Sequence, residues 1–238
     1  MSDQDTPFTD KAPASAPGPA LRPVRGAARR AIALLALAAL AWTARAVWHV
    51  RLAVTGQPAS GPPDQGGGQH RPLTALEDSY HQVSSMGGAV TLLCALAFLL
   101  WLDRVRDNAR ALSGAEPRYG YLWLFLGWII PVVNLWIPRG IVADAHRSVF
   151  PDRRLPAVVN WWWALWLAGL AGGVGLIYTD STDEVIARAY TAVLPLLAAD
   201  MVIVAAAGTA ALMIRTLTTA QQRRMDETPP TGRPGIAP

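Results

Sequence analysis

Charged residues are scarce in this chain and make up 16% of its 238 residues. An average soluble protein contains roughly 25%. Hydrophobic residues make up 52%, and the charges collect in short blocks between long apolar runs. This pattern excludes an ordinary soluble domain and is typical of an α-helical membrane protein with several spans.

Cysteine is nearly absent, since Cys94 is the only one, and this excludes an intramolecular disulfide. The four histidines, His49, His70, His81 and His146, do not pair at the spacing of metal ligands, and we expect His146 to be a solvated helix residue. The sequence contains no HExxH, GxSxG or P-loop motif and no carboxylates paired for acid–base catalysis. We therefore predict no catalytic, metal or cofactor site and do not expect an enzyme.

Long apolar runs are what the sequence has instead. Twenty helical residues cover about 30 Å, the thickness of the hydrocarbon core. The first run has an alternative interpretation as a cleaved signal peptide, because Ala44-Arg45-Ala46 fits a small-x-small site. Thr74 and Glu77 have the spacing of a capping box, which would begin a helix that continues through the second run. The runs predict an all-α fold with four transmembrane helices, over residues 31–50, 83–102, 157–178 and 190–214.

The segments outside these runs are polar or rich in proline and glycine. Residues 1–28 and 219–238 are predicted to be disordered tails because they contain no periodic apolar pattern. Residues 55–72 are rich in glycine, proline and glutamine, which predicts a flexible loop. The transmembrane helical domain is therefore expected over residues 29–218.

A fifth apolar segment, residues 121–138, is interrupted by polar residues and prolines. Pro131 disfavours helix at the residue before it. Asn134 can cap a second helix through its side-chain oxygen, and Pro138 would fall in the first turn of that helix. The segment is expected either to return to the same side as a re-entrant or interfacial hairpin, or to cross as a fifth, proline-kinked span. The candidate hairpin motif consists of Gly127, Trp128, Pro131, Asn134, Trp136 and Pro138.

The distribution of basic residues favours one of these two topologies. If all five segments cross, the basic residues other than Arg45 divide equally, 10 on each side. If residues 121–138 return, they divide 17 to 3. Cytoplasmic loops of membrane proteins carry an excess of Lys and Arg. We therefore predict four transmembrane helices plus a re-entrant or interfacial segment, with both termini cytoplasmic.

Several motifs occur in an order that resembles a known family. FLLWLDRVRDNARAL is followed by GWIIPVVNLWIP, by Ala-His-Arg-Ser, by NWWWALW and by IRTLTTAQQRR. This order is similar to that of the bacterial family DUF4328, over roughly residues 80–224. The resemblance implies a multi-pass protein of the bacterial cell (inner) membrane. It implies no reaction, cofactor or catalytic residue, because the family has no assigned function.

Asp200 is the one acidic residue deep within a predicted span. An intramembrane carboxylate is costly, and the default hypothesis is function. Arg45 is the best candidate partner, because its long side chain can bend along the membrane normal. Asp200 is then either a buried ion-paired carboxylate that fixes helix packing or a proton or cation site facing a polar cavity. Asn134 is the third candidate polar residue, as a ligand-binding group in the hairpin or as a plain helix cap.

Two further patterns concern packing and partners. Gly169 and Gly173 form a GxxxG pattern, which favours close helix packing, within the chain or in a dimer. The arginine clusters beside the spans are expected to face anionic lipids on the cytoplasmic side and not nucleic acid. A homo-oligomer or another membrane protein is the alternative partner.

The sequence leads to three hypotheses of function. The first is a small membrane scaffold or accessory subunit that acts through lipid or protein contacts. The second is a channel or transporter that uses Asp200. The third, for which the sequence offers no motif, is a membrane-embedded enzyme.

Overall fold

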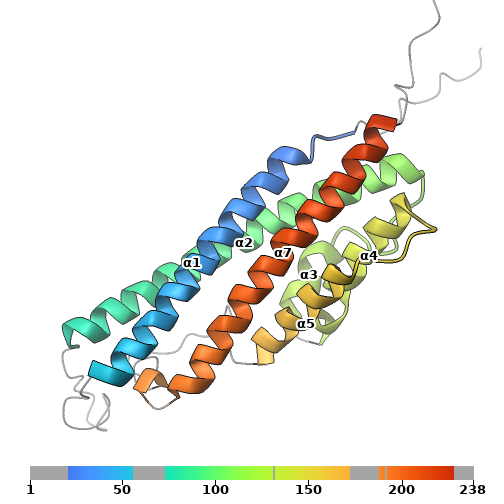
Figure 1. The fold of residues 1–238 in the computed structure, drawn as a ribbon. Coiled ribbons are helices and arrows are strands. Elements are labelled where there is room, and N and C mark those ends of the chain that lie inside the picture. Colours follow the sequence, from blue (N-terminus) through green and yellow to red (C-terminus); the bar gives the residue numbers. More distant parts are fainter. Residues whose placement is uncertain (1–20, 56–72, 131, 172–187, 191, 228–238) are drawn as a thin grey trace, which may run out of the picture.

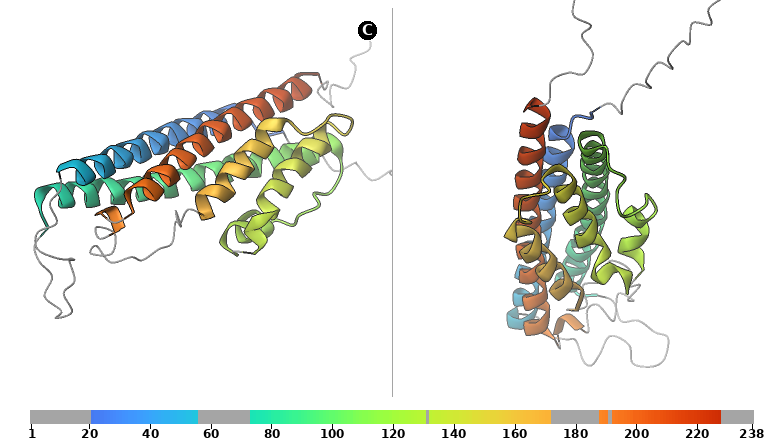
Figure 2. Two further views of the ribbon diagram at one scale, coloured as in Figure 1. Left: turned by 60° about the horizontal axis from the view of Figure 1, so that its bottom comes forward. Right: turned by 90° about the vertical axis from the view of Figure 1, so that its right-hand side faces the viewer.

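The computed structural model describes residues 21–55, 73–130, 132–171, 188–190 and 192–227, and within these residues the fold is entirely helical. Three long helices run side by side along the molecule (Figure 1): α1 (Arg25–Thr55), α2 (Ala75–Ser113) and α7 (Val193–Glu227). Shorter elements lie on one side of them (Figure 2): α3 (Trp123–Ile129), the 3₁₀ turn η1 (Val133–Leu135), α4 (Ile137–Val149) and α5 (Ala157–Ala171). The predicted all-α class is confirmed.

Hydrogen bonds between helix ends define how the three long helices run. The Arg22 backbone N–H donates to Asn108 Oδ1, and Asn108 Nδ2 donates to the Arg22 carbonyl, each over 2.8 Å. At the opposite end, Trp48 Nε1 donates to the Ser79 hydroxyl over 2.8 Å. α1 is therefore antiparallel to α2, and α7 runs parallel to α2 (Figure 1). We call these the Asn108 end and the His49 end of the bundle.

The predicted capping box begins α2. The Thr74 hydroxyl accepts from the Glu77 N–H over 3.3 Å, and the Glu77 carboxylate accepts from the Thr74 N–H over 2.8 Å. The helix ends at Gly114, which has φ 66° and donates its N–H to the Arg110 carbonyl. Glycine adopts this left-handed conformation without a Cβ clash. α2 therefore continues unbroken from the capping box through the predicted second span and the charged segment after it.

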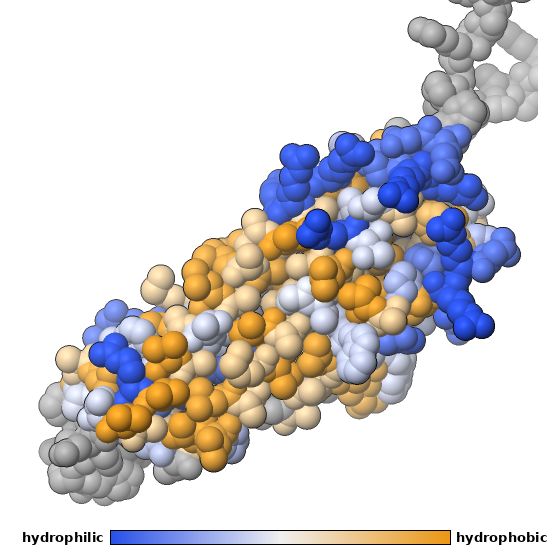
Figure 3. Space-filling view, in the orientation of Figure 1, coloured by the Kyte–Doolittle hydropathy of each residue, from blue (hydrophilic) through white to orange (hydrophobic). Residues whose placement is uncertain are grey.

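An exposed apolar surface surrounds the middle of the bundle. Each of the three long helices is long and apolar enough to cross a membrane. In α2, only 17% of the 18-residue apolar stretch that could span it is buried within the protein. Figure 3 shows an apolar band between two more polar ends. Large exposed apolar surfaces on a helix bundle indicate contact with lipid. The described part of the chain thus has three candidate spans plus the shorter apolar α5, whereas four spans were predicted. α5 covers the first part of the predicted third span, and residues 172–178 of that span lie outside the described residues.

The predicted tail after Thr218 is wrong over its first part, because α7 continues to Glu227. Tertiary contacts stabilise this extension. The Thr218 hydroxyl accepts from Trp101 Nε1 over 3.0 Å, and Gln221 Nε2 donates to the Val105 carbonyl over 2.8 Å. At the other terminus the helix begins at Arg25, within the tail predicted for residues 1–28. The remaining parts of both predicted tails, residues 1–20 and 228–238, lie outside the described residues, as do residues 56–72 of the predicted loop.

Residues 121–138 fold back on themselves. The Arg118 N–H, before this segment, donates to Asp144 Oδ2, after it, over 2.9 Å. Tyr119 and Gly140 are also in close contact, because a Cβ atom added to Gly140 would lie only 2.5 Å from Tyr119 Oη. A helix that crossed a bilayer would place its ends about 30 Å apart. The segment therefore enters and leaves at the same end of the bundle, as expected for a hairpin.

The cap predicted for this hairpin is wrong. Asn134 lies in η1, and its buried Oδ1 has no hydrogen-bond partner in the described chain. The extra 3₁₀ turn places Trp136 at the N-cap of α4, where it makes no side-chain cap hydrogen bond. Pro138 lies in the first turn of α4, as predicted. Pro131 lies outside the described residues, so its predicted role in the turn stays a prediction.

Candidate functional site

The structure brings Arg45 and Asp200 together at the His49 end. Arg45 Nε lies 3.1 Å from Asp200 Oδ1, and Arg45 Nη2 also donates to that oxygen. The side chain of Asp200 is fully buried and that of Arg45 is 17% exposed. Arg45 belongs to α1 and Asp200 to α7, so the ion pair links two of the three long helices.

The sequence of α1 explains why Arg45 points towards α7. Trp42, Arg45 and His49 are spaced three and four residues apart, which places them on one face of the helix. Arg45 Cζ lies 4.0 Å from the centroid of the Trp42 ring, a distance at which the ring attracts the cation. Trp42 is itself held, because its Nε1 donates to the Thr91 hydroxyl over 2.9 Å. The guanidinium is therefore positioned between an aromatic ring and the carboxylate.

His49 is a member of this cluster that sequence reasoning missed. Its Nε2 lies 3.4 Å from Asp200 Oδ2, and its side chain is fully buried. The His49 ring also packs on Tyr80 of α2, with ring centroids 5.1 Å apart. The available signal was its position one helical turn beyond Arg45, on the same face. Both oxygens of the Asp200 carboxylate thus face α1, one towards Arg45 and the other towards His49.

A second buried carboxylate, Glu77, belongs to the first turn of α2. Glu77 Oε2 serves the helix cap, and Oε1 accepts from the Tyr190 hydroxyl over 3.1 Å. A small apolar cluster containing Leu52, Tyr80 and Ala189 packs at this end of the bundle. Glu77 therefore joins the start of α2 to the chain that leads into α7, in addition to capping its own helix.

The chemistry of this cluster is that of a compensated buried charge. A carboxylate taken out of water is tolerated when a cation and hydrogen bonds replace its hydration. Arg45 supplies both at Asp200 Oδ1, whereas Oδ2 accepts no hydrogen bond in the described chain. In the described part of the chain, no group of three or more His, Cys, Asp or Glu side chains is arranged to hold a metal ion. The geometry supports a link between α1 and α7 more directly than it supports binding of an ion.

The other predicted site residues lie elsewhere. Asn134 is in η1, which packs against α3 and α4, and it is not part of the Asp200 cluster. Gly169 packs on α7, where an added Cβ would lie 3.4 Å from Ile203 Cγ1. This contact is the intramolecular packing that the GxxxG pattern allowed. Gly173 lies outside the described residues.

His146, expected to be solvated, is buried in α4 at the Asn108 end. Its ring lies 5.5 Å from the Phe150 ring, and both line a small cavity with Gln221 of α7. Burial lowers the pKa of His146, and the nearby charges of Arg147 and Arg153 lower it further. His146 is therefore a neutral packing residue where α4 meets α2 and α7.

Comparison with known proteins adds a family. The family model described as "Domain of unknown function (DUF4328)" matches residues 73–219, which is more than half of the chain. The chain belongs to the DUF4328 family. No curated protein matches it, and no solved structure does. The part matched to DUF4328 runs from the capping box of α2 to the last turns of α7 and includes Asp200, whereas Arg45 and His49 precede it.

Proposed function

We propose that this DUF4328 protein is a small membrane scaffold or accessory subunit, which acts through contacts with lipids or other membrane proteins. The observation that carries the proposal is the state of Asp200, which is buried and paired with Arg45. A carboxylate that moves protons or cations must be reachable by them, and the paired one is enclosed by helices. A channel or transporter is the second candidate, favoured by the buried His49 beside Asp200, whose ring nitrogens accept or donate no hydrogen bond in the described chain.

The proposed membrane arrangement has four spans and a re-entrant hairpin, with the Asn108 end in the cytoplasm of a bacterial cell. Two features support it: the hairpin starts and ends at the Asn108 end, and basic residues gather there. By the positive-inside rule, the arginine-rich end faces the cytoplasm, where anionic lipids attract it. The arginines at this end are Arg22, Arg25, Arg29, Arg30, Arg104, Arg106, Arg110, Arg118, Arg139, Arg147, Arg153, Arg154, Arg215, Arg223 and Arg224.

Cysteine labelling tests this topology. In a Cys94→Ser background, we expect Thr55→Cys to react with a membrane-impermeant thiol reagent in intact cells. Arg153→Cys and Arg223→Cys should react only after the membrane is permeabilised. All three positions are exposed, so a failure to react reports the side of the membrane. Labelling of Arg153→Cys and Arg223→Cys from outside would show that residues 121–138 cross the membrane as a fifth span.

Flux measurements on purified protein separate the two candidate functions. Vesicles that contain the wild-type protein are expected to pass protons and monovalent cations no faster than empty vesicles, because Asp200 is enclosed and its charge is compensated. Cross-linking in native membranes should in addition give a complex of defined composition. A flux that the wild type carries and that Asp200→Asn abolishes would establish the transporter instead.

A further inference from the structure

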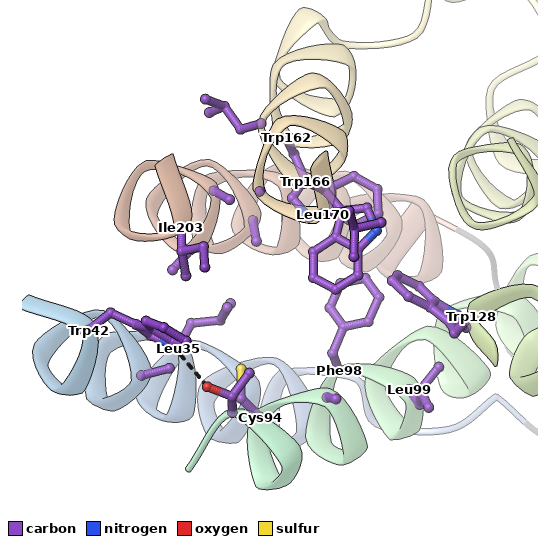
Figure 4. A pocket seen from close by; sticks show the side chains of 18 residues that line it. Leu35, Trp42, Cys94, Phe98, Leu99, Trp128, Trp162, Trp166, Leu170 and Ile203 are labelled. Carbon is purple, nitrogen blue, oxygen red and sulfur yellow. Dashed lines mark hydrogen bonds between the residues drawn. The ribbon is translucent and has the colours of Figure 1, made fainter. Parts of the chain in front are cut away.

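A pocket of about 190 Å³ lies within the helix bundle, between its two ends (Figure 4). α1, α2, α5 and α7 line it, and Trp128 of α3 completes one side. Its aromatic wall is continuous, because the Phe98 ring centroid lies 5.5 Å from that of Trp128 and 5.7 Å from that of Trp162. The rest of the lining includes Leu35 and Trp42 of α1 and, on α7, Ile203 with alanines such as Ala206 and Ala207 (Figure 4). Large rings and small alanines thus line the same space.

The pocket offers almost no polar group to a ligand. The Trp42 N–H donates to the Thr91 hydroxyl, which in turn donates to the Gly87 carbonyl over 2.7 Å. The indole nitrogens of Trp128 and Trp166 donate no hydrogen bond in the described chain, but both atoms are buried. Apolar cavities of this kind stay free of water, and a polar ligand would lose its hydration without compensation. The occupant must therefore be apolar.

The surroundings of the pocket supply such an occupant. The pocket is partly open, and its walls come from the apolar middle of the bundle. The same stretch of α2 exposes Leu92, Leu96 and Leu100 on its outside. An engineered cavity of about 150 Å³ in another protein holds a benzene molecule. A pocket of 190 Å³ is thus large enough for a stretch of hydrocarbon chain and too small for a whole lipid.

We propose that this pocket binds one acyl chain of a bilayer phospholipid, whose headgroup stays outside the pocket. The inference rests on the proposed function, because it names a lipid contact through which the protein acts. The bound chain fills the space between the aromatic wall and the side chains of α1 and α7. It supplies the van der Waals contacts that an empty cavity lacks.

Photo-crosslinking in vesicles tests the proposal. The wild-type protein is reconstituted in phosphatidylethanolamine and phosphatidylglycerol, with a small fraction of phosphatidylethanolamine that carries a diazirine on one acyl chain. After illumination, peptide mapping is expected to find adducts on pocket residues such as Cys94, Phe98 and Trp166. Adducts confined to outward-facing residues such as Leu92 and Leu96 would overturn the proposal.

Two neighbouring alanines of α7 give a matched pair of variants. Ala206→Leu places a larger side chain inside the pocket. Ala205→Leu makes the same change in side-chain volume on the exposed face of α7. Pocket adducts should be lost in Ala206→Leu and unchanged in Ala205→Leu. Cys94→Leu fills the pocket from α2 and replaces Ala206→Leu if that variant does not fold. Equal adduct yields in the filled and control variants would also overturn the proposal.

A second cross-linking experiment would reveal a different occupant. If a bifunctional reagent joins pocket residues to residues 172–187, this chain fills its own pocket and the proposal fails. The test is separate from that of the proposed function. A missing acyl adduct leaves the flux and complex measurements unaffected, whereas an Asp200-dependent flux would refute the scaffold with the pocket still occupied.

Discussion

Asp200→Ala is expected to lower the free energy of unfolding by about 3–5 kcal/mol, the largest effect that we anticipate for a single substitution. The variant leaves the guanidinium of Arg45, which is only 17% exposed, without its counter-ion. Arg45→Ala should have a comparable effect, because it leaves the fully buried carboxylate uncompensated. The measurement is thermal or denaturant unfolding in mild detergent, together with the amount of folded protein in the membrane.

The double variant distinguishes the ion pair from two separate contributions. Arg45→Ala with Asp200→Ala removes both charges together, so part of the loss should be recovered. Arg51→Ala is the matched control on α1, since Arg51 is exposed and stacks on Trp48 at the surface. It should change stability by only a fraction of either single effect. Additive losses in the double variant would mean that Arg45 and Asp200 do not act as a pair.

Gly127→Ala is expected to destabilise the hairpin by about 1–3 kcal/mol, the usual cost of forcing a methyl group into a packed contact. The new Cβ would lie 2.7 Å from Ile137 Cγ2 and 3.3 Å from Ile137 Cβ. Ile137 begins α4, and a β-branched side chain in a helix has one strongly preferred rotamer. The clash would therefore push α3 away from α4. A lower unfolding midpoint and greater proteolysis between the two helices would reveal it.

A second substitution should reverse this effect. Ile137→Ala removes the clashing atom, so the Gly127→Ala, Ile137→Ala chain should be more stable than the sum of its single changes predicts. Gly88→Ala is the control, because an added Cβ at Gly88 meets nothing within 4 Å. An alanine there should leave stability equal or slightly higher, given its better helix propensity. An unchanged midpoint in Gly127→Ala would contradict the close approach of α3 and α4.

The sequence alone was sufficient for the helical class and for much of the course of the chain. Long apolar runs identify helices, because a buried or lipid-facing backbone must satisfy its own hydrogen bonds. The capping box at Thr74 and Glu77 is formed by residues three positions apart, so the sequence alone was sufficient to predict it. The breaks in residues 121–138 are equally local. Together with the distribution of basic residues, they predicted a fold-back that the contact between Arg118 and Asp144 displays.

The tertiary structure was required for most features made by residues far apart in the chain, although the sequence had already named Arg45 as the candidate partner of Asp200. The extension of α7 to Glu227 depends on Thr218 and Gln221 meeting α2, and polar composition alone predicted a tail there. His49 joins Asp200 across 151 positions only because α1 and α7 pack face to face. The pocket is likewise formed only where side chains of α1, α2, α3, α5 and α7 meet. The physical reason is that capping and hydropathy act over a few residues, whereas burial is set by which helix faces meet.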